Sequence, residues 1–500
     1  MTHTFRPSPA ALAVLLFVCA TGALRSQCPD GTPPPCAVRA GRPRPASNSL
    51  AVLYFDNVSR DTSEAYLADG LTEELISRLG DVPRLEVKSR YVSRRFRGKA
   101  IEDPAALGRQ TGAAYLVTGS VRRAGSRVRV TAELVRAATG DRLWGATLEE
   151  TGDLLGIEEQ IAREVATGIA GRLLPAERAT LTRRPTRDLE AYDLYLQGAH
   201  YLQIVTEAGQ RRAVDLFARA IARDSQFALA WAGLAVGWSD LADSWVAPKE
   251  AYARAMDAAE RAVALDSSTA ETWNSLEQPI AAMTYDLGRS EQVTRRALAL
   301  DPRNVYALQW LGLLHVSEGH VEEGLTEVQR SWGLDTLSMF GAFSLAQALA
   351  ILERGPELGA VLSRLASAMS PDDLRQLEGT IRLEQGDCAE AAQRFDWRYI
   401  GGWPPGQAVA SLVCAGRRDA ARAVVDSMVA ARSGSGYFNP LAIAAGYTVL
   451  GDTTEAYRWL ERAYDEHTYW FMFLRVIKVF APLRGDAHFA ALVARMRTGD

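Results

Sequence analysis

The sequence contains few of the residues and motifs that catalytic and metal sites use. Of 500 residues, 5 are cysteines and 6 are histidines, and neither His-Glu-x-x-His nor Gly-x-Ser-x-Gly occurs. A phosphate-binding loop requires Gly-x4-Gly-Lys-Ser/Thr, whereas Gly98-Lys99-Ala100 lacks both the first glycine and the final hydroxyl. The kinase motifs His-Arg-Asp and Asp-Phe-Gly and the paired metal carboxylates of nucleotide cyclases are also absent. The sequence therefore predicts no catalytic, cofactor-binding or metal site.

Lysine is also scarce, and the charge of the chain is nearly balanced. The net charge is −4 over the whole length, so composition indicates no nucleic-acid partner. Two local clusters are nevertheless basic. The first is a loop with aromatic residues, made of Arg90, Tyr91, Arg94, Arg95, Phe96 and Arg97. The second is a predicted hairpin that carries Arg122, Arg123, Arg127 and Arg129. We interpret both as solvated surfaces, with an acidic partner or lipid headgroups as the alternative.

Long apolar runs are limited to the N-terminus. Residues 10–20, AALAVLLFVCA, are shorter than a membrane span of roughly 20 residues and fit the apolar region of a signal peptide. We expect residues 1–27 to be a signal peptide, cleaved after Ala23 or a few residues later, and the protein to be periplasmic or otherwise exported. An uncleaved membrane anchor is the alternative. Residues 28–47 are rich in proline and arginine, which predicts a flexible tether.

The cysteines fit an exported protein. Cys28 and Cys36 enclose a proline-rich turn, which predicts a small local disulfide in an oxidising compartment. Two thiols without a nearby histidine are too few for a zinc site, which takes four ligands. The residues before Cys28 do not supply the small side chains of a lipoprotein site.

Residues 48–174 show the alternation of strand and helix patterns expected of an α/β domain. Residues 50–55 form an unbroken apolar run typical of a buried strand, and leucines at 67, 71, 75 and 79 lie on one face of the following helix. The further expected strands are 85–89, 114–121, 128–134 and 142–148, and the further expected helices are 104–111 and 157–174. This order predicts a mixed sheet with packed helices, closed by the last helix.

Several separated motifs of this domain resemble the TolB N-terminal-like domain of bacterial proteins. They are Leu50-Ala51-Val52-Leu53 with Phe55 and Asn57, residues 66–76 (YLADGLTEELI), residues 115–123 (YLVTGSVRR) and residues 138–144 (ATGDRLW). The resemblance implies a binding or sensory module without enzymatic activity. Such modules often stand beside a kinase, a nucleotide cyclase or a DNA-binding winged helix.

Residues 175–188 form a charged segment that we expect to be a linker, with Pro175 ending the preceding helix. From residue 189 to residue 500 a helical motif recurs with a period near 34 residues. Examples are residues 217–224 (FARAIARD), 259–266 (AERAVALD) and 294–301 (TRRALALD), with a loop insertion expected around residues 244–248. The pattern resembles the tetratricopeptide repeat. It implies an all-α superhelix in which the first helix of each hairpin lines a concave groove for a protein or peptide.

The two remaining cysteines lie within these repeats. Cys388 begins the second helix of one hairpin, and Cys414 ends the first helix of the next. Because neighbouring helices are antiparallel, we expect these ends to meet and form a disulfide. Two buried free thiols are the alternative.

An aromatic segment, residues 464–480, precedes the C-terminus. We interpret it as the buried core of the last repeat, with a hydrophobic peptide groove as the alternative. The leading hypothesis is an exported, non-enzymatic binding protein whose partner is a protein or peptide of the cell envelope, with membrane contact only if the signal segment stays uncleaved. The rival hypothesis is a sensory or regulatory component of an envelope signalling system.

Overall fold

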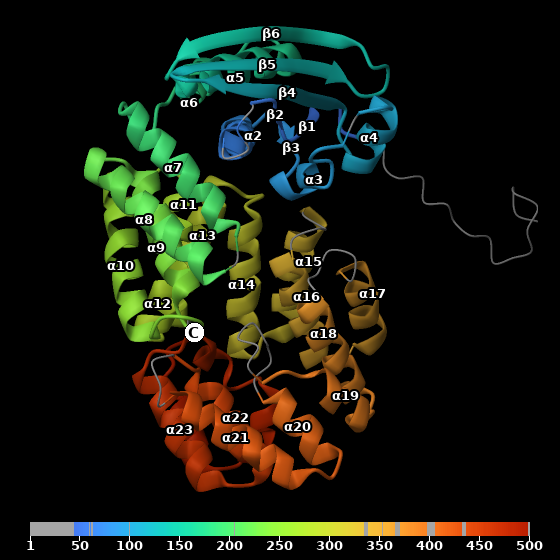
Figure 1. The fold of residues 1–500 in the computed structure, drawn as a ribbon, viewed down its shortest axis with the longest axis vertical. Helices are drawn as coiled ribbons and strands as arrows, with labels where there is room; N and C mark the ends of the chain where they lie inside the picture. The colour runs from blue at the N-terminus through green and yellow to red at the C-terminus, as the bar shows by residue number, and fades with distance from the viewer. Residues whose placement is uncertain are drawn as a thin grey trace, which may run out of the picture. The chain divides into compact units, whose positions relative to one another are not determined.

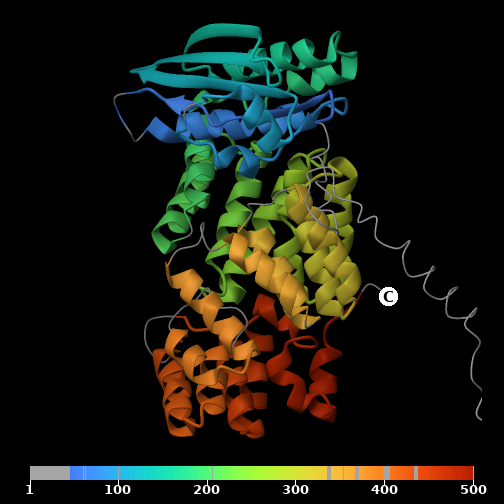
Figure 2. The same cartoon turned by 90° about the vertical axis from the view of Figure 1, so that its right-hand side faces the viewer.

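The computed structural model describes residues 45–498, except 60, 62–63, 100, 205, 335–338, 353, 366–370, 398–405 and 433–436. The described chain begins with a six-stranded sheet and its helices, and helices make up nearly all of the remainder (Figures 1 and 2). A mostly helical chain with a small mixed sheet near its start is therefore confirmed. The predicted signal peptide and most of the tether lie outside the described residues.

The sheet has the order β3-β1-β4-β5-β6, and β2 also pairs with β4. Its parallel part joins β1 to β3 and β4, whereas β4, β5 and β6 form an antiparallel meander. The strand bounds are β1 (Ser49–Val52), β2 (Asp56–Asn57), β3 (Glu86–Val87), β4 (Tyr115–Ala124), β5 (Arg127–Arg136) and β6 (Arg142–Thr151). The predicted strands are thus confirmed, with β2 as an addition.

Both faces of β1 are covered, which explains its continuous apolar sequence. Leu50 and Val52 belong to the core shared with α2 (Ala65–Gly80) and α5 (Leu154–Ala170). Ala51 belongs to a smaller core on the other face, under α4 (Pro104–Thr111). Along β5 buried residues alternate with more exposed ones, so one face of the strand lies in the core and the other faces solvent, as the sequence predicts.

The segment predicted as a linker contains a helix, so that prediction is wrong. Pro175 is the first residue of α6 (Pro175–Leu181), where proline fits because its missing N–H would have no helical acceptor. Leu181 is fully buried, and Arg84 pairs with Glu177 of this helix at 2.5 Å. The chain therefore passes from the sheet to the repeats through a packed helix. A second short helix, α3 (Arg90–Arg94), replaces the loop predicted there.

Beyond residue 188 the helices follow one another as packed pairs. The first part of this helical array consists of α7 (Leu189–Leu202), α8 (Glu207–Arg223), α9 (Ala228–Leu241), α10 (Pro248–Leu265), α11 (Ala270–Asn274), α12 (Glu277–Thr284), α13 (Leu287–Leu300), α14 (Val305–Glu318) and α15 (Val321–Leu334). The second part consists of α16 (Met339–Ile351), α17 (Gly355–Leu365), α18 (Pro371–Glu384), α19 (Cys388–Arg394), α20 (Gln407–Cys414), α21 (Arg418–Arg432), α22 (Pro440–Leu450) and α23 (Thr453–Asp465). Two 3-10 helices, η2 (Tyr469–Phe473) and η3 (Lys478–Leu483), and α24 (Ala487–Val493) end the described chain.

The recurring sequence motif forms the same turn each time. Asp224, Asp266 and Asp301 end α8, α10 and α13 in extended conformation, and each backbone N–H donates to an alanine carbonyl four residues earlier at 2.9 Å. Each aspartate side chain then accepts from the backbone N–H two residues later, at 2.9–3.0 Å. The alanines are fully buried, because small residues allow helices to cross closely.

One helix of the array is interrupted for a clear reason. Pro279 lies in α12, and its ring would clash with the carbonyl of Ser275 if α11 continued without a break. The break lies at Ser275, which ends α11.

Among the described residues, no helix combines the length and the apolar character that a membrane span requires.

Candidate functional site

The aromatic segment near the C-terminus packs against helices that lie far earlier in the chain. We call residues 467–483 the closing segment. Phe471 and Phe473 of η2 and Phe480 of η3 are fully buried. η2 contacts α12 and α14, and η3 contacts α22. The interpretation of this region as buried core is therefore confirmed, and that core extends beyond the last hairpin to α12 and α14.

The closing segment changes the expected groove. Every residue of α14 from Ala307 to Glu318 is buried, because α13, α15, α16 and η2 all contact this helix. On α22 most residues are likewise buried, with η3 against it. An open peptide groove is therefore wrong for these helices, where the chain fills its own inner surface.

Backbone hydrogen bonds hold the C-terminal end against the turn between α12 and α13. The Tyr285 hydroxyl donates to the Thr468 carbonyl at 3.0 Å. Leu287 N–H donates to the Arg497 carbonyl at 2.8 Å, and Arg497 N–H donates to the Tyr285 carbonyl at the same distance. Arg497 also pairs with Asp286 at 3.1 Å. These contacts fix the start of the closing segment and the chain that follows it.

A buried carboxylate, Asp243, joins the loop after α9 to the closing segment. Its backbone is left-handed, with φ of 60°, a conformation that aspartate tolerates better than most residues. Its carboxylate accepts from Tyr469 N–H at 3.0 Å and from the Tyr252 hydroxyl at 3.2 Å. Burial raises the pKa of Asp243 to about 7, and these hydrogen bonds oppose the rise. The expected loop insertion is confirmed, and Asp243 in this loop contacts the closing segment.

Glu277 of α12 contacts the same tyrosine from another side. The Tyr469 hydroxyl donates to Glu277 Oε1 at 3.4 Å, and the ring of Trp310 meets the Tyr469 ring edge-on with centroids 5.7 Å apart. Glu277 is 1 % exposed, and burial raises its pKa to about 8. The sequence analysis missed both acids, because nothing near them in the sequence marks a contact about 200 residues away.

A second buried polar group joins the α/β domain to the array. Arg78 of α2 contacts Glu74 at 2.8 Å and donates to the Arg183 carbonyl at 2.9 Å. Glu158 of α5 accepts from the Tyr192 hydroxyl of α7 at 2.7 Å. Burial is the largest cause that raises the pKa of Glu158 well above its ordinary value. This group fixes α2, α5 and α7 against one another.

The basic clusters predicted as solvated surfaces are largely paired within the chain. Arg97 contacts Asp69 at 2.7 Å, and Asp69 also contacts His200 of α7 at 3.0 Å. In the hairpin, Arg123 contacts Asp193 of α7 at 3.1 Å. The hairpin's Arg127 and Arg129 pair with Glu149 at 3.6 and 2.6 Å. The clusters therefore contribute to internal contacts, several of them between the α/β domain and α7.

A cavity of about 220 Å³ lies where α2, the sheet and α7 meet. Its lining is mainly apolar and includes Leu67, Val128, Leu154 and Leu196. The charged residues Arg123 and Asp193 also line it. The volume is below the 300–1,000 Å³ typical of small-molecule sites. The cavity therefore gives little support for a cofactor site.

Three partly exposed tryptophans lie on the first hairpins. Trp231 and Trp238 are seven residues apart on α9, so they share a face of the helix, and Trp273 lies on α11. The Arg254 guanidinium lies over the Trp238 ring at 4.5 Å, and Arg296 lies over Trp273 at 6.0 Å. We call these five residues the tryptophan patch. It contrasts with residues 307–318 of α14, which are all buried.

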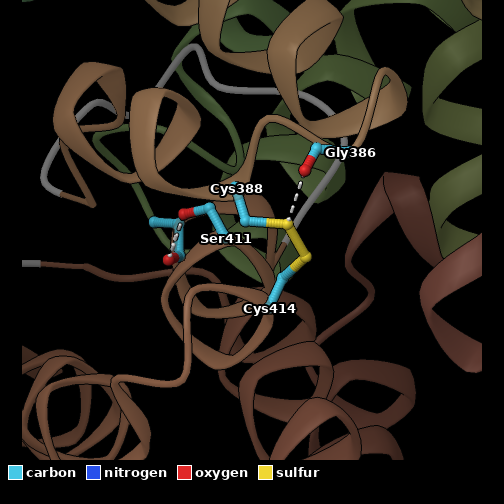
Figure 3. The surroundings of a disulfide bond; sticks show 5 residues. Gly386, Cys388, Ser411 and Cys414 are labelled. Carbon is cyan, nitrogen blue, oxygen red and sulfur yellow. Dashed lines mark hydrogen bonds between the residues drawn. A yellow bond between two sulfur atoms is a disulfide. The ribbon is translucent and has the colours of Figure 1, made fainter.

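The structure brings Cys388 and Cys414 together. They lie at the start of α19 and the end of α20, with Cα atoms 5.5 Å apart and their sulfurs joined (Figure 3). The separation fits the range that a disulfide requires. Cys28 and Cys36 lie outside the described residues. Among the described residues, no group of three or more metal-ligating side chains is placed to hold an ion.

Comparisons with known proteins give partial similarities. No protein-family model matches the chain. A curated protein of Rhizobium meliloti, whose name assigns it to the adenylate cyclases, is 30% identical over 239 residues, which are 47% of this chain. The match covers 40% of the length of that relative.

Solved structures that resemble parts of the chain include proteins with tetratricopeptide repeats. One from Thermus thermophilus has a TM-score of 0.33 at 17% identity and covers 39% of this chain and 98% of its own. One from Parabacteroides merdae has a TM-score of 0.36 at 10% identity and covers 53% of this chain and 100% of its own. A lipoprotein from Neisseria meningitidis has a TM-score of 0.19 at 20% identity and covers 25% of this chain and 99% of its own.

Proposed function

We propose that the chain is a protein-binding scaffold of the cell envelope, without catalytic activity of its own. In this proposal the α/β domain is a TolB-like module, the array is a tetratricopeptide-type superhelix, and residues 1–27 direct export. The partner is a protein or peptide, and contact with the membrane requires that the signal segment stay uncleaved. The sequence motifs in both parts of the chain support these assignments.

The tryptophan patch carries the proposal. Tryptophan and arginine are the residues most enriched at the energetic centres of protein interfaces. In the patch they lie on α9, α10, α11 and α13, and the three tryptophans stay partly exposed. Because the inner surface at α14 and α22 is filled, the patch is the better candidate for partner contact.

Site-specific crosslinking in cells tests this surface. A photoreactive amino acid would replace Trp238 or, in separate strains, Arg211, which lies on α8 in an exposed pair with Glu207. We expect crosslinked protein adducts from position 238 and none from position 211. Adducts of the same size and amount from both positions, or none from either, would count against the patch.

A second variant separates binding from folding. Trp231→Ala with Trp238→Ala should reduce recovery of the crosslinked partner at least tenfold, as expected for hot-spot residues that each contribute about 2 kcal/mol. The variant's thermal unfolding is compared with that of Arg211→Ala, so that a loss of binding without loss of the fold can be recognised.

A regulatory role in envelope signalling is the alternative function. One observation favours it, namely the partial similarity to a protein named as an adenylate cyclase. N-terminal sequencing of the protein from cells distinguishes the two. A mature end near residues 24–28 supports a released scaffold, whereas an intact N-terminus in the membrane fraction supports the regulatory component.

Export also bears on the cysteines. We infer two disulfides, Cys28–Cys36 and Cys388–Cys414, because an oxidising compartment stabilises such bonds. The short distance between the Cys388 and Cys414 Cα atoms supports the second bond.

A further inference from the structure

Strand β6 forms one border of the sheet. It ends the strand order β3-β1-β4-β5-β6 and pairs with β5 alone among the described residues. Figures 1 and 2 both show β6 at the outer side of the sheet, with no described element beyond it. Alternate residues of such a strand direct backbone N–H and C=O groups away from the sheet, where another strand can pair.

This border lacks most of the features by which proteins prevent strand pairing. β6 is ten residues long and contains neither lysine nor proline. Its only irregularity in register lies near its start, opposite Leu134 and Val135 of β5. Leu143 is 40 % exposed. Trp144 and Leu148 are only partly buried where they pack against the core that the sheet shares with α5. The strand is therefore long and uncharged in its middle.

The charges of β6 lie at its two ends and have opposite signs. Arg142 stands at the start and also pairs with Glu133 of β5 at 3.1 Å. Glu150 stands near the end beside Glu149, which pairs with Arg127 and Arg129 of β5. Two copies in antiparallel orientation, centred on Ala146, would place the arginine end of each strand against the glutamate end of the other. Parallel pairing would place like charges together. The pattern therefore matches an antiparallel copy of the same strand.

Apolar residues of β6 also match across the same axis. Trp144 and Leu148 are two positions on either side of Ala146, on the face that packs toward α5. Antiparallel pairing would bring the tryptophan of each copy beside the leucine of the other. Close apolar pairs of this kind stabilise neighbouring antiparallel strands, and they would complete the burial of both side chains.

We propose that β6 is a dimerisation strand, through which two copies of the chain form one continuous sheet about a two-fold axis. A two-fold interface requires a surface that is complementary to itself, and β6 meets this requirement in charge and in apolar pattern. The interface uses no residue of the tryptophan patch, because the patch lies on α9, α10, α11 and α13.

Sedimentation equilibrium of the full chain tests the dimer. We expect a monomer–dimer equilibrium in the wild type. Arg142→Glu should raise the dimer dissociation constant at least tenfold, and so should the double variant Glu149→Arg/Glu150→Arg, because each places like charges at both ends of the paired strands. Arg211→Glu on α8 is the control and should leave the constant unchanged.

Mixing the two charge variants makes the test independent of folding defects. An equimolar mixture of Arg142→Glu with Glu149→Arg/Glu150→Arg should form a heterodimer with nearly wild-type affinity, since opposite charges again meet at both ends. A wild-type protein that stays monomeric would overturn the proposal. So would a dimer that neither variant weakens, or a mixture that remains as monomeric as its components.

Discussion

Asp243 shows how a single buried acid can hold two distant parts of a chain together. Its carboxylate receives hydrogen bonds from residues on both sides of the contact, and it is only 7 % exposed. Removing a carboxylate from water costs less when the group is protonated, so the fold favours the neutral form. The contact between the closing segment and the array therefore depends on the protonation of Asp243 and, in the same direction, of Glu277.

The first prediction concerns pH. The folded-state pKa of Asp243 is raised to about 7 from 3.8, so its contribution is fully present below pH 4 and is lost as pH rises through 7. At pH 5 Asp243→Asn should be no more stable than the wild type. At pH 8 the variant should be more stable relative to the wild type than it is at pH 5. We expect the difference in unfolding free energy between variant and wild type to change by about 2–4 kcal/mol over this range.

Urea unfolding at several pH values measures this change. Glu277→Gln should show the same trend with its midpoint nearer pH 8, since the pKa of Glu277 is raised to about 8. Asp257→Asn serves as the control, because the Asp257 side chain on α10 is exposed. A difference between Asp243→Asn and wild type that stays constant with pH would contradict the assignment.

The second prediction concerns the Cys388–Cys414 pair. A disulfide closing a loop of 26 residues should stabilise the fold by about 3 kcal/mol through the reduced entropy of the unfolded chain. Reductant should lower the unfolding free energy of the wild type by that amount and leave Cys388→Ser unchanged. Alkylation of the unreduced, denatured protein should spare both cysteines; complete labelling of both would show that the bond is absent.

At the scale of elements, the closing segment is the feature that distinguishes this array from an open superhelix. Its contribution should be large, because several fully buried aromatic residues lie in it. Phe471→Ala should cost about 3–5 kcal/mol of stability through lost burial and a cavity. Tyr306→Ala, at a side chain 40 % exposed, is the control and should cost less than about 1 kcal/mol.

Hydrogen exchange locates the effect of this third prediction. Amides of α12, α13 and α14 should exchange faster in Phe471→Ala, since η2 contacts α12 and α14 and the C-terminal chain bonds to the turn before α13. Amides of the α/β domain should be unaffected. Faster exchange spread evenly over the chain would indicate a general loss of stability and no local opening.

Local sequence patterns predicted most elements, and the misses have physical reasons. The strands of the meander and helices such as α4 follow from side-chain period and from turn residues such as Gly112, which ends α4 in a left-handed conformation. Pro175 was misread because proline both ends helices and begins them. The position of the closing segment was not predictable, because its aromatic residues only indicate burial and do not specify which helices they meet.

At the scale of the whole described chain, the α/β domain and the first hairpins share one core. Leu194 and Leu196 of α7 belong to the same buried cluster as the sheet and α2. Gly70 of α2 lies so close to Leu196 that a Cβ atom there would approach its side chain to 2.9 Å. The boundary predicted between domains is therefore crossed by continuous packing.

The fourth prediction follows from this shared core. Leu196→Ala should cost about 2–5 kcal/mol, and unfolding followed by fluorescence and by circular dichroism should shift together. Leu300→Ala, at a side chain 36 % exposed, is the control. A separate early transition of the array, with the sheet intact, would show that the two parts unfold independently.

The sequence indicated where the candidate sites would be only when neighbouring residues carried the signal. Cys388 and Cys414, for example, were paired from their positions at helix ends. Arg78 and Glu158 were not recognised, because a buried charged residue looks in the sequence like one on a solvated helix face. Burial of charge is decided by elements that pack from elsewhere in the chain.

The contacts of the closing segment have a consequence for the order in which the chain folds. Tyr469 bonds to a residue 226 positions earlier, and Thr468 to one 183 positions earlier. Such non-local contacts slow folding, since a long loop must close before they form. During synthesis α12 and α14 must wait for the closing segment, and we expect them to remain open to chaperones until that segment has emerged.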